Sequence, residues 1–88
     1  MERKIKMIII TAKKWFQKSY GNTYHSVSVY RDSEFLGYIP FRYGYDDHYL
    51  NTAAGILGMT ETELRQDIRT NENKYHITVI DVQRKKEL

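Results

Sequence analysis

The chain has 88 residues, no cysteine and a formal net charge of +3. A chain of this length forms a single domain, residues 1–88, with one core and no deep cleft between domains. The absence of cysteine excludes disulfides and cysteine-based metal sites. The apolar run Met7–Ile10 is too short for a signal sequence or a membrane span, so we expect a cytoplasmic protein with no membrane partner.

Three strands are predicted in the first half of the chain, over residues 5–17, 24–31 and 35–42. The second strand shows the clearest alternation. His25, Val27 and Val29 fall on one face, whereas Tyr24 and Tyr30 fall on the other. We expect the valine face to meet the core and the tyrosine face to stay open.

Two short helices and a last strand follow. Asp46 or Asp47 is expected to cap the first helix, which ends at Gly58. Thr60 and Glu63 form a capping box that begins the second helix. The order β-β-β-α-α-β predicts an α+β fold: an antiparallel sheet of about four strands with two short helices on one face.

Tyrosine and positive charge are concentrated in parts of the chain. Six of the eight tyrosines lie in residues 19–30 and 40–50. Residues 1–31 carry a charge of +6, residues 32–81 carry −5, and residues 82–88 carry +2. If the first and last strands are neighbours in the sheet, the two basic ends merge into one patch that attracts polyanions.

These two features together predict a nucleic-acid-binding surface on the open sheet face. Aromatic rings stack on bases, and lysine side chains contact phosphates. The predicted binding residues are Lys13, Lys14, Trp15, Lys18, Tyr24, Tyr30 and Arg31.

The sequence leaves two other binding functions open. A protein-binding module that blocks a host factor would use the tyrosine-rich second stretch, with Tyr43, Tyr45, His48 and Tyr49 as contact residues. A weaker alternative is a homodimer that binds a small ligand or a nucleotide.

Catalysis and metal binding find little support. His25, Asp46, Asp47, His48 and His76 are the only potential metal set, and they lack ligand spacing such as HxxxH. Nothing supplies a nucleophile, base and orienting group together, or a phosphate-binding glycine loop. We therefore expect a protein that is not an enzyme and that has no metal and no cofactor.

Residues 52–68 show the residue pattern of a helix-turn-helix motif, with small alanines, a tight turn and a second amphipathic helix. The first turn of that second helix contains Glu61 and Glu63, which DNA phosphates would repel. The pattern therefore favours two helices packed as a corner over a DNA-reading unit.

The segments YGNTYHSVSVY (residues 20–30) and PFRYGYDDHYLNTA (residues 40–53) resemble a pattern in small uncharacterised proteins of bacteriophages and related mobile elements. In that pattern a GNTYHSV strand precedes a PFxYGYGxxY segment that leads into a helix. The resemblance covers the chain from Lys14 to Leu57, and Asp46 stands where the pattern more often has glycine. It implies a phage accessory protein that acts on a host macromolecule in the host cytoplasm, and it implies no activity.

Overall fold

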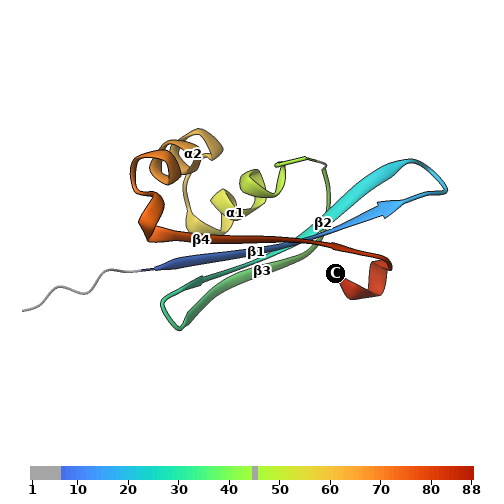
Figure 1. The fold of residues 1–88 in the computed structure, drawn as a ribbon, viewed down its shortest axis with the longest axis horizontal. Coiled ribbons are helices and arrows are strands. Elements are labelled where there is room, and N and C mark those ends of the chain that lie inside the picture. The colour runs from blue at the N-terminus through green and yellow to red at the C-terminus, as the bar shows by residue number, and fades with distance from the viewer. Residues whose placement is uncertain (1–6, 45) are drawn as a thin grey trace, which may run out of the picture.

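The computed structural model describes residues 7–44 and 46–88, and within them the elements follow the predicted order (Figure 1). They are β1 (Ile8–Gln17), β2 (Asn22–Arg31), β3 (Glu34–Tyr43), α1 (Tyr49–Leu57), α2 (Glu61–Thr70) and β4 (Tyr75–Val82). Short 3₁₀ turns at Glu72–Lys74 and Lys85–Glu87 flank β4. The predicted α+β class is confirmed, with both helices on one face of the sheet.

The four strands form one sheet in the order β3-β2-β1-β4. β1 pairs with β2 and β2 pairs with β3 in antiparallel orientation, as predicted. The sheet is mostly antiparallel, as predicted, and its one parallel pair is β4 beside β1. The chain crosses from β3 to the opposite edge through both helices, and such a crossover is the connection that parallel strands require. The first and last strands are therefore neighbours.

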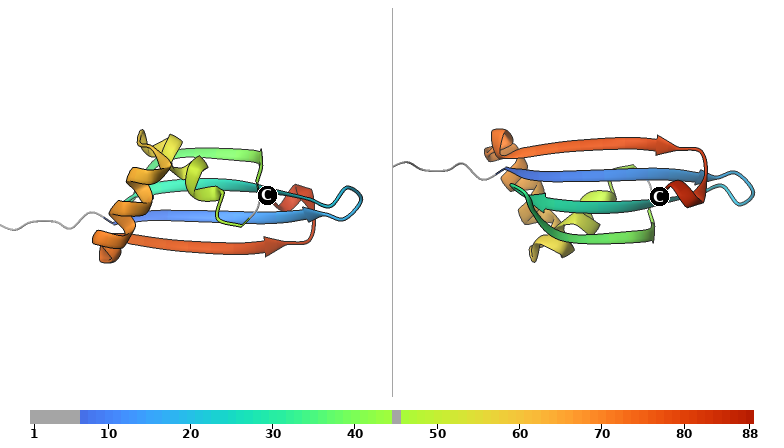
Figure 2. Two further views of the ribbon diagram at one scale, coloured as in Figure 1. Left: turned by 90° about the horizontal axis from the view of Figure 1, so that it is seen from above. Right: turned by 90° about the horizontal axis from the view of Figure 1, so that it is seen from below.

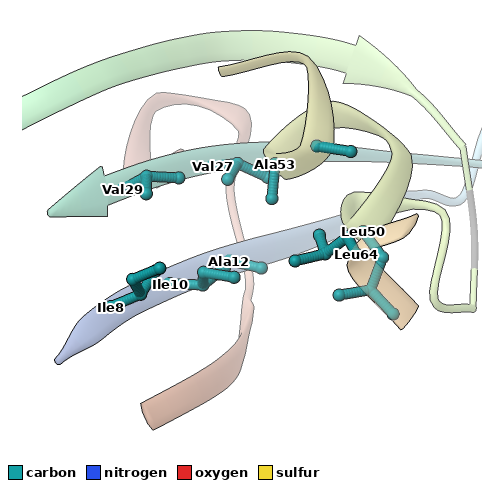
Figure 3. Packing of buried hydrophobic residues seen from close by; sticks show 9 residues of the cluster. Ile8, Ile10, Ala12, Val27, Val29, Leu50, Ala53 and Leu64 are labelled. Atoms are coloured by element: carbon teal, nitrogen blue, oxygen red, sulfur yellow. The ribbon is translucent and has the colours of Figure 1, made fainter. Parts of the chain in front are cut away.

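Alternate residues of β1 and β2 supply the sheet side of the core, and the two helices supply the other side (Figure 3). The buried apolar residues are Ile8, Ile10, Ala12, Val27, Val29, Leu50, Ala53, Ala54 and Leu64. Side chains alternate between the faces of a strand. The neighbours of these strand residues in sequence therefore point to the face that no helix covers.

The ends of the helices confirm one prediction and correct another. The Thr60 hydroxyl accepts from the Glu63 backbone N–H at 3.1 Å, and the Glu63 carboxylate accepts from the Thr60 N–H at 2.9 Å, as a capping box requires. Neither Asp46 nor Asp47 caps α1, whose N-cap residue is His48 without a side-chain hydrogen bond. Asp47 instead accepts a hydrogen bond from Arg65 of α2 at 2.9 Å.

Candidate functional site

The face of the sheet opposite the helices carries most of the aromatic side chains of the protein. We call it the aromatic face and define it by seven residues that the pairing of the strands places together. They are Trp15 of β1, Tyr24 and Tyr30 of β2, and Phe35, Tyr38, Phe41 and Tyr43 of β3. The placement of Tyr24 and Tyr30 on this face agrees with the alternation seen in the sequence.

Two irregularities in β3 put its four aromatic residues on one face. In a regular strand, residues three apart point to opposite faces. The pairing of β3 with β2 shifts register between Val29 and Tyr30 and again between His25 and Val27. Each shift corresponds to one extra residue in β3. The two extra residues therefore bring the side chains at positions 35, 38, 41 and 43 to the same side.

At one end of the aromatic face the rings form a ladder across three strands. The ring centroids of Trp15 and Tyr24 are 5.8 Å apart, and those of Tyr24 and Phe41 are 4.5 Å apart, with both pairs stacked. Tyr43 meets Tyr24 edge-on at 5.6 Å. Such pairs add about 0.5–1.5 kcal/mol each beyond the burial of their area. The ladder therefore holds its rings in fixed positions.

The other end of the aromatic face carries a second, smaller group. The rings of Tyr30 and Phe35 lie 5.3 Å apart, and Phe35 is 56% exposed. Tyr30 and Tyr24 are six residues apart on β2, which corresponds to about 20 Å along a strand. A ligand that touches both aromatic ends must therefore be an extended one.

Between the two aromatic ends runs a row of hydroxyl groups. Strand register places Thr78 beside Thr11, Thr11 beside Ser28, and Ser28 beside Tyr38. Each of the four strands contributes one member, and we call this set the hydroxyl row. Hydroxyl groups both donate and accept hydrogen bonds, so the row offers polar contacts across the full width of the sheet.

The residues after β4 fold back onto the aromatic face (Figure 2). The Tyr38 hydroxyl donates a hydrogen bond to the backbone oxygen of Leu88 at 3.0 Å. The Nζ atom of Lys85 lies 4.8 Å from the centroid of the Phe41 ring. The C-terminal residues therefore belong to this surface. The sequence contained a basic C-terminal end but gave no signal of where it would lie.

Among the strand residues whose side chains lie on the aromatic face, one is a lysine and none is an aspartate or glutamate. Lys13 pairs with Ser26 on β2 and with Ile80 on β4, which places it on the aromatic face. Within the four strands the acidic residues are Glu34 and Asp81. Glu34 pairs with Arg31, and Asp81 pairs with Lys14, so both acids belong to the helix-covered side.

The predicted nucleic-acid-binding residues are divided between the two faces of the sheet. Lys13, Trp15, Tyr24 and Tyr30 lie on the aromatic face. Lys14 pairs with the buried His25 and Arg31 pairs with the buried Ile8, so both lie on the helix-covered side. Lys18 lies in the turn between β1 and β2 and lines a cavity of about 390 Å³ with Lys14.

The residues of the protein-binding alternative do not share one surface. Tyr43 lies on the aromatic face, whereas Tyr49 packs against the core from α1. His48 lies beside the buried His25, with ring centroids 5.9 Å apart, on the helix-covered side. Tyr45 lies outside the described residues.

His25 is a buried link between the sheet and the helix layer. Its Nε2 atom lies 2.8 Å from the Thr52 hydroxyl of α1, and its Nδ1 atom lies 3.3 Å from the backbone oxygen of Gly44. Burial lowers the pKa of His25 below its usual 6.5, which favours the neutral form of the ring. In residues 7–44 and 46–88, no three His, Cys, Asp or Glu side chains gather in a way that would hold a metal ion.

Arg65 of α2 pairs with two acidic side chains near the start of the two helices. Arg65 forms ion pairs with Asp47 at 2.9 Å and with Glu61 at 2.6 Å. Hydrogen bonds from Arg65 lower the pKa of both carboxyl groups. Arg65 is therefore already paired with acids of the helix layer, beside the acidic first turn of α2. These ion pairs hold the two helices together as a packed corner.

Comparison with known proteins gives no match for this chain among protein-family models, curated proteins or solved structures. Over the described part of the chain, no helix has both the length and the apolar character to cross a membrane.

Proposed function

We propose that this protein binds single-stranded nucleic acid on its aromatic face, without catalysing a reaction. The observation that carries the proposal is the composition of that face. Seven aromatic side chains share it with Lys13 and Lys85, while the two acids of the strands lie on the other side. Stacking of a base on an aromatic side chain contributes about 1–3 kcal/mol per base.

The shape of the face favours unpaired bases over a duplex. In a duplex the flat faces of the bases are stacked on each other and cannot reach protein side chains. The two aromatic ends lie about 20 Å apart along β2. A flexible single strand can follow this distance, with the hydroxyl row contacting its sugars and phosphates between the stacked bases.

A titration of the single tryptophan tests the proposal directly. Trp15 is the only tryptophan and belongs to the ladder, so a base that stacks there changes its fluorescence. Single-stranded DNA and RNA of about 12 nucleotides suit a site of this kind. If Lys13 and the three basic residues after β4 contact phosphates, the logarithm of the affinity falls with the logarithm of salt with a slope of about −3.

Two adjacent lysines provide a matched pair of variants. Lys13→Ala removes a cation from the aromatic face, and we expect weaker binding and a salt slope less steep by about 0.7. Lys14→Ala removes the same charge from the helix-covered side, and we expect almost no effect. Equal losses in the two variants would mean that the aromatic face is not the phosphate-binding surface.

Absence of binding by the unaltered protein to both DNA and RNA at low salt would refute the proposal. The aromatic face would then be assigned to a protein partner, the alternative that Tyr43 at the edge of the ladder still permits. Light scattering of the free protein reports at the same time whether it is a dimer.

A further inference from the structure

Residues 83–88 lie across the part of the aromatic face that a ligand would use, and we call them the strap. The Glu87 carboxylate accepts hydrogen bonds from the backbone N–H groups of Gln83 and Arg84, both at 2.9 Å. These bonds turn the chain back at the end of β4. The strap then contacts β1 and ends at Tyr38 of β3, on the face away from the helices (Figure 2).

Two contacts of the strap involve side chains of the aromatic face that a bound nucleic acid would also contact. Lys85 lies over the ring of Phe41, whose centroid is also 4.5 Å from that of Tyr24. Leu88 accepts the hydrogen bond that the Tyr38 hydroxyl would otherwise offer to a ligand. The strap therefore lies against two residues of the aromatic face, Phe41 and Tyr38.

Resting on the proposed function, we propose that the strap competes with single-stranded nucleic acid for the aromatic face and that binding lifts it. In the closed state the strap holds a cation over Phe41 and an acceptor at Tyr38. In the open state a base takes the place over Phe41 and an oxygen of the ligand takes the acceptor position. The freed side chains of Arg84, Lys85 and Lys86 then lie beside the ligand and contact its phosphates.

The contacts of the strap are suited to displacement. One hydrogen bond between exposed groups and one exposed cation–π contact are each weak in water. A small set of such contacts keeps the strap closed most of the time without locking it. An open fraction of about 0.1–0.3 weakens the apparent affinity for the ligand about three- to tenfold.

Two substitutions at Glu87 separate the fold-back from the charge. Glu87→Ala and Glu87→Gln both remove one negative charge, but glutamine keeps a side-chain oxygen that accepts from the two backbone N–H groups. We expect Glu87→Ala to bind a single-stranded oligonucleotide about three- to tenfold more tightly than Glu87→Gln. Nuclear magnetic resonance of the ligand-free proteins should show the side-chain protons of Lys85 shifted upfield by the Phe41 ring in Glu87→Gln and unshifted in Glu87→Ala.

A second comparison covers the case in which Glu87→Ala leaves the strap in place. A chain that ends at Val82 loses Arg84, Lys85, Lys86 and Glu87, a net loss of two positive charges. The double variant Arg84→Gln/Lys86→Gln loses the same two charges and keeps the strap. We expect the shortened chain to bind more tightly than the double variant.

The outcomes distinguish this proposal from the proposed function. If the unaltered protein binds neither DNA nor RNA, both proposals are wrong. If it binds, and the variants without the closed strap bind no more tightly than their charge-matched controls, only competition by the strap is refuted. The strap is then a fixed part of the binding surface. An unshifted Lys85 in the unaltered, ligand-free protein would also refute the closed state.

Discussion

Gly37 lies where β3 passes beneath α1, and we expect alanine at this position to destabilise the fold. A Cβ atom there would lie 2.9 Å from Cγ2 and 3.6 Å from Cγ1 of Ile56. Carbon atoms pack best at about 3.5–4.0 Å, so α1 or the Ile56 side chain would have to move by several tenths of an ångström. Overpacking of this kind costs about 1–3 kcal/mol.

A double-mutant cycle assigns this cost to a single contact. Ile56→Ala removes both γ carbons and leaves the Ile56 Cβ at 3.8 Å from the new methyl group, an ordinary contact distance. Alone it should cost about 1–2 kcal/mol, because Ile56 is only partly buried. We expect Gly37→Ala/Ile56→Ala to be more stable than the sum of the single variants predicts, by about 1 kcal/mol or more.

Thermal and urea unfolding followed by circular dichroism measure the cycle, since 1 kcal/mol shifts the Tm of a domain of this size by about 4–8 °C. Gly55→Ala is the control. Gly55 lies within α1, and a Cβ atom there would meet no atom within 4 Å apart from its chain neighbours and the backbone of its own helix. Alanine at this position should therefore stabilise the helix by about 0.5–1 kcal/mol. Additive effects of Gly37→Ala and Ile56→Ala would refute the reasoning, because the clash would then lie elsewhere.

Two further predictions concern stability. Burial lowers the pKa of His25 below 6.5, so the unfolded chain binds more protons than the folded one just below that pH. The free energy of unfolding should therefore fall as the pH drops from about 7 to about 5, and His25→Gln should flatten this part of the profile of urea midpoint against pH; an unchanged slope would contradict it. Thr60→Ala removes the cap of α2 and should cost about 1 kcal/mol in chemical unfolding. Thr62→Ala on the same helix should be almost neutral, and equal costs would count against the capping box.

The local rules of the sequence were sufficient for much of the fold. The alternation in β2 identified its core face, and the Thr60 capping box marked the start of α2. Those local rules could not predict that β4 pairs with β1 in parallel, because the orientation of a strand depends on how the chain crosses the helix layer. The expected aspartate caps of α1 failed because Asp47 has a charged partner in Arg65, a contact set by packing of the two helices.

The candidate site was only partly visible in the sequence. Simple alternation already separates Lys13 from Lys14, since neighbouring residues of a strand point to opposite faces. Phe35, Tyr38 and Phe41 could not be assigned to one face, because their spacing of three contradicts a regular strand. Their common side depends on the two register shifts in β3. Gly37 and Pro40 lie beside these shifts, and both residue types occur at bulges, but neither one fixes the face to which the following side chains point.

The pairing of β1 with β4 also sets the order in which the sheet can form. β1 is made first, yet one of its edges pairs only with β4, near the other end of the chain. Contacts so distant in sequence form slowly. Until Val82 has been made, this edge exposes unpaired backbone groups beside Ile8 and Ile10, which are liabilities for aggregation in an incomplete chain. In a chain under synthesis, residues 83–88 are therefore made only after all four strands of the sheet.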